Sequence, residues 1–341
     1  MAPRAFITGI AGLSLSDDER GFIRESRPWG FILFKRNVDN PAQVKALVEE
    51  LRGTVGSPDA PVLIDQEGGR VQRLGPPQWP VYPPGAVFST LYDIDPDAGL
   101  TAARLSARLI ADDLAALGIT VDCLPLADVP IAGADAVIGD RAYGTSPDKV
   151  AAIARAVTDG LAQGGVLPVL KHIPGHGRAT ADSHHRLPTV DTAREELDRT
   201  DFAAFRPLAD LPMAMTAHVV FSALDAAQPA TTSATIIDQV IRESIGFQGL
   251  LMSDDVSMNA LAGSIAERTR AIVAAGCDVV LHCNGKLDEM RQVVAETPEL
   301  QGRALVRAEA ALAARQAPQP FDRAAARAEL DALIGRAKVG A

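Results

Sequence analysis

Eight short apolar runs, spread along the whole 341-residue chain, constrain its fold more than any other feature of the sequence. Each run has the length of a β-strand and is rich in valine, isoleucine and leucine. The runs are continuous rather than alternating, which is typical of parallel strands buried on both faces. They cover residues 5–8, 30–34, 61–64, 119–126, 166–170, 213–217, 249–252 and 278–281.

Amphipathic helical patterns fall between these runs. The clearest helix has Asn40 as its N-cap, Pro41 as its first residue and Gly53 as its stop. The other clear helical stretches are residues 100–117, 146–164 and 232–245.

Strand and helix alternating eight times predict an α/β protein built as a single (β/α)8 TIM barrel. We allow for an irregular strand order at its start. Residues 1–341 are expected to form one catalytic domain, with a last helix near 300–316 packed outside the barrel. An open doubly wound sheet is the alternative. The number of runs, and the lack of a G-x-G-x-x-G motif after the first run, favour the barrel.

Two connections in this pattern are unusual. Residues 75–97 contain six prolines and are expected to lack regular structure, and residues 173–190 are rich in glycine, histidine and polar side chains. Both connections follow predicted strands, which is where a barrel builds its active site.

Composition restricts the partners of the chain. Aromatic residues make up only 4% of the sequence, so few stacking platforms exist for a long polysaccharide or single-stranded nucleic acid. A net charge of -10 disfavours nucleic acid and anionic membranes. The chain lacks both a long apolar segment and a secretory signal, which predicts a cytoplasmic protein. Cys123, Cys277 and Cys283 lie in apolar surroundings without a C-x-x-C spacing and are expected to be buried free thiols.

Charged and polar side chains follow most of the predicted strands. A single such residue is more often a solvated cap or a salt-bridge partner, but many of them converging on one barrel rim indicate a functional site. Four of the six histidines lie between His172 and His185. A cluster of this kind on a glycine-containing loop indicates either metal binding or acid–base chemistry.

Several longer motifs carry a family resemblance. The sequence Lys171-His-Ile-Pro-Gly-His-Gly, followed by Asp182-Ser-His184, resembles the signature of family 3 glycoside hydrolases of the β-N-acetylhexosaminidase type. Further matching motifs occur in the family's order at residues 32–37, 65–73, 137–141 and 253–258, so the resemblance covers about residues 5–284. Within the family, the chain is most similar to the short bacterial enzymes of peptidoglycan recycling.

The resemblance implies a catalytic set. Asp254 would be the nucleophile that forms a covalent glycosyl ester, and Asp255 is the alternative nucleophile. If neither acid is catalytic, both would simply cap the helix that follows. His184 would be the acid–base residue and Asp182 its partner. An imidazole that titrates near pH 6.5 can protonate a leaving oxygen and then activate water.

The resemblance also implies a set of sugar ligands. The residues expected to bind a terminal N-acetylglucosamine are Asp65, Arg73, Arg141, Lys171 and His172. For Arg73 and Arg141, salt bridges inside the barrel mouth are the alternative. Further residues are expected to support the rim or to lie behind the site: Asn37, His218, His176 and Glu67.

The activity implied is that of a retaining exo-β-N-acetylglucosaminidase. It would remove N-acetylglucosamine from N-acetylglucosaminyl-1,6-anhydro-muramic acid fragments, with or without peptide, in cell-wall recycling. We expect a monomer with a small amino-sugar substrate, no nucleic-acid or membrane partner, no cofactor and no metal. The alternatives are a zinc-dependent amidohydrolase barrel with ligands at Asp182, His184 and His185, a sugar-binding relative without activity, and a phosphorylase in which phosphate replaces water.

Overall fold

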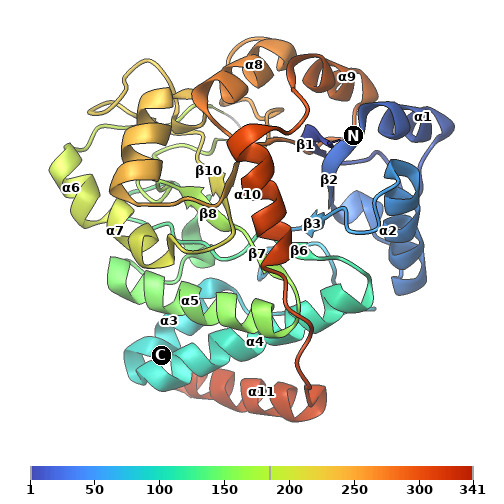
Figure 1. Cartoon of the computed structure of the whole chain (residues 1–341). Coiled ribbons are helices and arrows are strands. Elements are labelled where there is room, and N and C mark those ends of the chain that lie inside the picture. The colour runs from blue at the N-terminus through green and yellow to red at the C-terminus, as the bar shows by residue number, and fades with distance from the viewer. Residues whose placement is uncertain (1, 184–185, 340–341) are drawn as a thin grey trace.

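The computed structural model describes residues 2–183 and 186–339 and contains a closed barrel of eight parallel strands (Figure 1). Each predicted run supplies one strand, and Val169 divides the fifth strand into two named segments. The strands are β1 (Arg4–Thr8), β2 (Pro28–Leu33), β3 (Val62–Ile64), β6 (Val121–Asp122), β7 with β8 (Leu167–Pro168 and Leu170–Ile173), β10 (Met213–Thr216), β12 (Leu250–Met252) and β13 (Val280–His282).

The strand order explains how the barrel closes. One sheet runs β13-β1-β2-β3-β6-β7 and a second runs β12-β10-β8, with every pairing parallel. The sheets join where β7 continues into β8, and again where Met252 pairs with Val279, the residue before β13. The predicted (β/α)8 fold is confirmed. The irregular order that we allowed for is not seen, since β1 lies between β13 and β2.

Helices surround the strands (Figure 1). Those that accompany the barrel are α1 (Asp17–Ser26), α2 (Pro41–Val55), α3 (Gly85–Ile94), α4 (Pro96–Ala116), α5 (Pro147–Gln163), α6 (Arg194–Arg199), α7 (Asp201–Phe205), a π-helix (Ile236–Ser244), α8 (Ile265–Ala275) and α9 (Leu287–Glu296). Two more follow, α10 (Gly302–Ala313) and α11 (Arg323–Val339), so the helix predicted near 300–316 is present but is not the last one. None of the helices in the described part of the chain is long and apolar enough to span a membrane.

Three details predicted for the segments between the strands were wrong. The Asn40 side chain caps α2 as predicted, but the helix continues past Gly53 to Val55. It ends at Gly56 because that residue takes the left-handed conformation, with φ of 70°, that helix termination favours. The proline-rich connection also contains α3, because its prolines flank residues 85–94 rather than interrupt them. Pro96 then starts α4, four residues before the predicted helix.

Apolar side chains line both faces of the strands, as their continuous apolar sequences require. Phe6, Phe31 and Val62 point outward to the helices, whereas Ile7 and Ile32 belong to the cluster that fills the barrel. That inner cluster also includes α10 residues, so α10 lies across one end of the barrel, as Figure 1 shows. All three cysteines are buried free thiols, as predicted.

The last helix, α11, is linked to the loop that follows β3. Arg323 at the start of α11 contacts Asp113 of α4 at 2.6 Å, and the Tyr82 hydroxyl donates to the other oxygen of Asp113 at 2.6 Å. The Tyr82 backbone bonds to both Gly69 and Gln72. The hairpin of β4 (Gln66–Gly68) and β5 (Val71–Gln72) is therefore anchored to two helices.

Substituting Tyr82→Phe should lower the free energy of unfolding by about 1–2 kcal/mol, because it removes a buried hydrogen bond to a carboxylate. Urea denaturation followed by circular dichroism measures this loss. Tyr92→Phe, at a partly buried tyrosine of the same core, is the control. Equal stability of Tyr82→Phe and the wild type would contradict the proposed anchor.

Candidate active site

A pocket of about 270 Å³ lies at the carboxyl ends of the barrel strands. Its polar lining comes from residues that are far apart in sequence, because parallel strands bring their carboxyl ends to one rim. Seven of the eight predicted catalytic and sugar-binding residues line it: Asp65, Arg73, Arg141, Lys171, His172, Asp182 and Asp254. The eighth, His184, lies outside the described residues.

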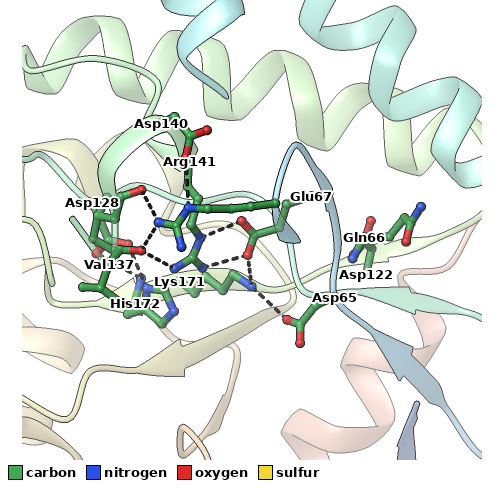
Figure 2. A network of polar contacts seen from close by, with 12 residues as sticks. Asp65, Gln66, Glu67, Asp122, Asp128, Val137, Asp140, Arg141, Lys171 and His172 are labelled. Carbon is green, nitrogen blue, oxygen red and sulfur yellow. Dashed lines mark hydrogen bonds and ion pairs between the residues drawn. The ribbon is translucent and has the colours of Figure 1, made fainter. Parts of the chain in front are cut away.

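Lys171 is the centre of an ion network in this pocket (Figure 2). Its ammonium group, on β8, is almost fully buried and contacts Asp65 Oδ1 at 3.0 Å and Glu67 Oε1 at 2.7 Å. Arg73 contacts the second oxygen of Asp65 at 2.9 Å. Arg141 binds both oxygens of Glu67 at 2.8 Å. The two arginines therefore form the salt bridges that we considered as an alternative, and both also line the pocket.

The charges of this network are mutually stabilised. Burial on its own would raise the pKa of Glu67, but Lys171 and Arg141 outweigh burial and hold that pKa at about 2. Burial opposes ionisation of Asp65 too, yet Lys171 and Arg73 lower its pKa well below the usual range. Burial lowers the pKa of Lys171, and the two carboxylates more than compensate. At neutral pH the network therefore offers ionised acceptors and charged donors, which suit sugar hydroxyls.

A buried acid that the sequence analysis missed, Asp128, orients His172. Its carboxylate lies 2.8 Å from His172 Nδ1 (Figure 2). The same carboxylate accepts the His176 backbone N–H at 2.7 Å. Burial would raise the pKa of Asp128, but His172 lowers it to about 2. The ionised Asp128 carboxylate accepts from Nδ1 of His172, so the other ring nitrogen, Nε2, is the polar atom of the imidazole that remains for other contacts. In the sequence, Asp128 could have been recognised only as an acidic residue that stands two positions after the fourth apolar run.

His176 lies behind the pocket, where the sequence analysis expected it. Its Nε2 is 3.1 Å from the Ser183 hydroxyl, next to Asp182 on the same loop. Burial, and then the nearby His172, lower the pKa of His176 to about 4. The ring is therefore uncharged at neutral pH and ties the loop to the barrel.

The two acids after β12 have different surroundings. The Asp255 carboxylate accepts hydrogen bonds from the Ser257 N–H at 3.0 Å, the Ser257 hydroxyl at 2.7 Å and the Cys283 N–H at 3.1 Å. Asp254 Oδ1 accepts the Asp255 N–H at 2.8 Å. Asp255 is thus engaged in holding the loop. Capping of the next helix does not explain either acid, because Ser264 caps α8.

Asn37 joins the loops that follow two neighbouring strands, β1 and β2. Its side chain is fully buried, accepts the Phe34 N–H at 2.9 Å and donates to the carbonyls of Ile10 and Gly12 at 3.1 and 2.8 Å. These bonds join the loop after β1 to the loop after β2, beside the pocket.

The described residues contain no cluster of three or more histidine, cysteine, aspartate or glutamate side chains that could hold a metal ion. Two of the three residues in the alternative zinc site, His184 and His185, lie outside the described residues. Asp182 itself lines the pocket.

The fold and the pocket together define a (β/α)8-barrel enzyme whose site is rich in carboxylates and cations. Residues 9–310 match the N-terminal domain of glycosyl hydrolase family 3. The chain belongs to this family.

Similar proteins agree with this assignment. The β-hexosaminidase of Alkalilimnicola ehrlichii is 39% identical over 280 residues, which cover 81% of this chain and 79% of that protein. NagZ from Neisseria gonorrhoeae, solved with a zinc ion, superposes with a TM-score of 0.86 at 31% identity over 98% of this chain and 99% of that one. The same protein in complex with N-trifluoroacetyl-D-glucosamine gives a TM-score of 0.84 at 31% identity, over 99% and 98% of the two chains. The comparisons confirm the resemblance and the predicted enzyme class, a glycoside hydrolase of the β-N-acetylhexosaminidase type.

The lowered pKa of His176 predicts a pH-dependent stability. In the unfolded chain His176 gains a proton near pH 6.5, whereas in the folded protein it does so near pH 4, so folding becomes less favourable as the pH falls through this window. Between pH 7.5 and 5 the wild type should lose about 2 kcal/mol more free energy of unfolding than His176→Gln. Guanidinium unfolding curves at several pH values measure the difference, and parallel pH profiles would contradict it.

Proposed function

We propose that this protein is a retaining exo-β-N-acetylglucosaminidase that works by double displacement. The observation that carries the proposal is the position of Asp254, which follows β12 and lines the same pocket as the Asp65–Lys171 ion pair. A nucleophilic carboxylate beside a cluster of sugar-binding charges is the arrangement that a retaining glycosidase needs. The other acid of the pair, Asp255, also lines the pocket, and its bonds to Ser257 and Cys283 give it a role in holding the loop.

The proposed reaction has two steps. The Asp254 carboxylate attacks the anomeric carbon while His184 gives its proton to the leaving oxygen, and a glycosyl ester forms. His184 then takes a proton from water, which attacks the ester and releases the sugar. Asp182 is proposed to orient His184, and its place in the pocket lining supports this role. In this mechanism the acetamido group of the substrate is not the nucleophile.

The proposed sugar ligands are Asp65, Arg73, Arg141, Lys171 and His172. Their ion pairs hold charged acceptors and donors in fixed positions, which is how a site fixes the orientation of a polar ligand. A pocket of about 270 Å³ suits one terminal sugar better than a long chain. Both features support exo action.

The wider role is inferred from the family. A gonococcal relative was solved with N-trifluoroacetyl-D-glucosamine, which supports an N-acylglucosamine substrate here. We infer that the natural substrates are N-acetylglucosaminyl-1,6-anhydro-muramic acid fragments of peptidoglycan, with or without peptide. The protein would act as a cytoplasmic monomer in cell-wall recycling, with the whole chain forming one catalytic domain.

Asp254→Ala should lower kcat for 4-nitrophenyl N-acetyl-β-D-glucosaminide by about 10³-fold or more, because the covalent intermediate cannot form. Peptide mapping of wild-type protein trapped with a 5-fluoro substrate analogue should place the label on Asp254. A label on Asp255 would reverse the assignment. Wild-type protein without any turnover between pH 5 and 8 would favour the alternative of a sugar-binding relative.

His184→Ala should lower kcat much more for a substrate with a poor leaving group than for one with a good leaving group, because a good leaving group needs little protonation. Comparing methylumbelliferyl, nitrophenyl and alkyl glycosides in one assay measures this dependence. Equal losses for all three would contradict a role in protonating the leaving oxygen.

A further inference from the structure

Three polar residues contact the backbone of the proposed nucleophile and its neighbour from the β10 side, and of these the sequence analysis named only His218, as a support of the rim. Thr216 is the last residue of β10, His218 follows two residues later, and Thr231 lies in a short helical turn, Ala230–Thr232. All three side chains are fully buried. We call these three residues the β10 clasp.

The clasp forms a continuous path of contacts. The Asp254 N–H donates to Thr216 Oγ1 at 3.4 Å, and the Thr216 and Thr231 hydroxyls are 2.8 Å apart. Thr231 Oγ1 is in turn 2.8 Å from His218 Nδ1. His218 Nε2 lies 3.0 Å from the backbone oxygen of Asp255, and since a carbonyl only accepts, Nε2 must donate. The path thus begins at Asp254 and ends at its neighbour.

The loop after β12 is held from two sides. On the β13 side, the Ser253 N–H donates to Val279 O at 3.1 Å, the Val256 N–H donates to Leu281 O at 2.9 Å, and the Asp255 carboxylate accepts from Cys283 N. On the β10 side, the clasp holds the Asp254 N–H and the Asp255 carbonyl. Since these two groups flank the peptide between the acids, the clasp fixes the backbone from which the Asp254 side chain projects.

We propose that the β10 clasp positions the Asp254 carboxylate for its attack on the anomeric carbon. This inference rests on the proposed function, because it concerns the nucleophile. Without the clasp, the loop would keep its bonds to β13 and lose its hold on β10, so that the carboxylate would shift within the pocket. Displacing a reacting group by about 1 Å can cost roughly 100-fold in rate.

The main test compares Thr216→Val with Thr216→Ser. Valine has the shape of threonine but cannot accept the Asp254 N–H, whereas serine can. Thr216→Val should lower kcat by about 10- to 100-fold with KM within about threefold of the wild type, and Thr216→Ser should restore most of kcat. Thr158→Val is a matched control, because it removes a buried hydroxyl from α5, where that group bonds to Ala154 O at 3.0 Å. It should keep wild-type kcat, and all melting temperatures should be measured in parallel.

A second pair of variants keeps the test informative if Thr216→Val folds poorly. The amide of His218→Gln can still donate to Asp255 O, whereas His218→Leu cannot, so the glutamine variant should retain the higher kcat. Equal kcat within either pair, or wild-type kcat in Thr216→Val, would overturn the clasp while leaving the proposed function intact. No turnover by the wild type in the same assay would instead refute the proposed function.

Discussion

The site depends on one buried ammonium group. Lys171 projects from β8 with only 2% of its surface exposed, and a charge in that position is tolerated only if it is fully paired. Asp65 and Glu67 provide the pairing, and each of these carboxylates then binds an arginine. Lys171 therefore links β8 to the loop after β3, and the bond between Arg141 and Glu67 joins that loop to the one after β6. Removing its charge would leave two buried carboxylates with one partner each, which is far less favourable than the intact network.

The fold was largely predictable because its main signal is local. A continuous apolar run shows a doubly buried strand without reference to the rest of the chain, and all eight runs became strands. The helix ends were harder, because Gly53 and Gly56 look alike in sequence and only the backbone conformation distinguishes them. The α3 helix was missed because prolines were counted across the whole connection, whereas helix formation depends on their exact positions.

The residues that line the site were predictable from the sequence motifs, but the ion pairs that they form with one another were not. The sequence cannot show that Arg73 binds Asp65 while Arg141 binds Glu67, since these contacts exist only after the barrel has closed. Asp128 was overlooked for the same reason, because it is a single acid whose importance lies in its contacts with two distant histidine residues. The net charge of -10 also gave no indication of a pocket whose lining includes four lysine and arginine side chains.

The central claim, attack by Asp254 to form a covalent intermediate, has a direct consequence for the product. Two successive displacements at the anomeric carbon restore its configuration, whereas one direct attack by water inverts it. Proton NMR during the first minutes of hydrolysis of a β-glycoside distinguishes the two. We predict that the β-anomer of N-acetylglucosamine appears first and then mutarotates. Initial release of the α-anomer would contradict the mechanism.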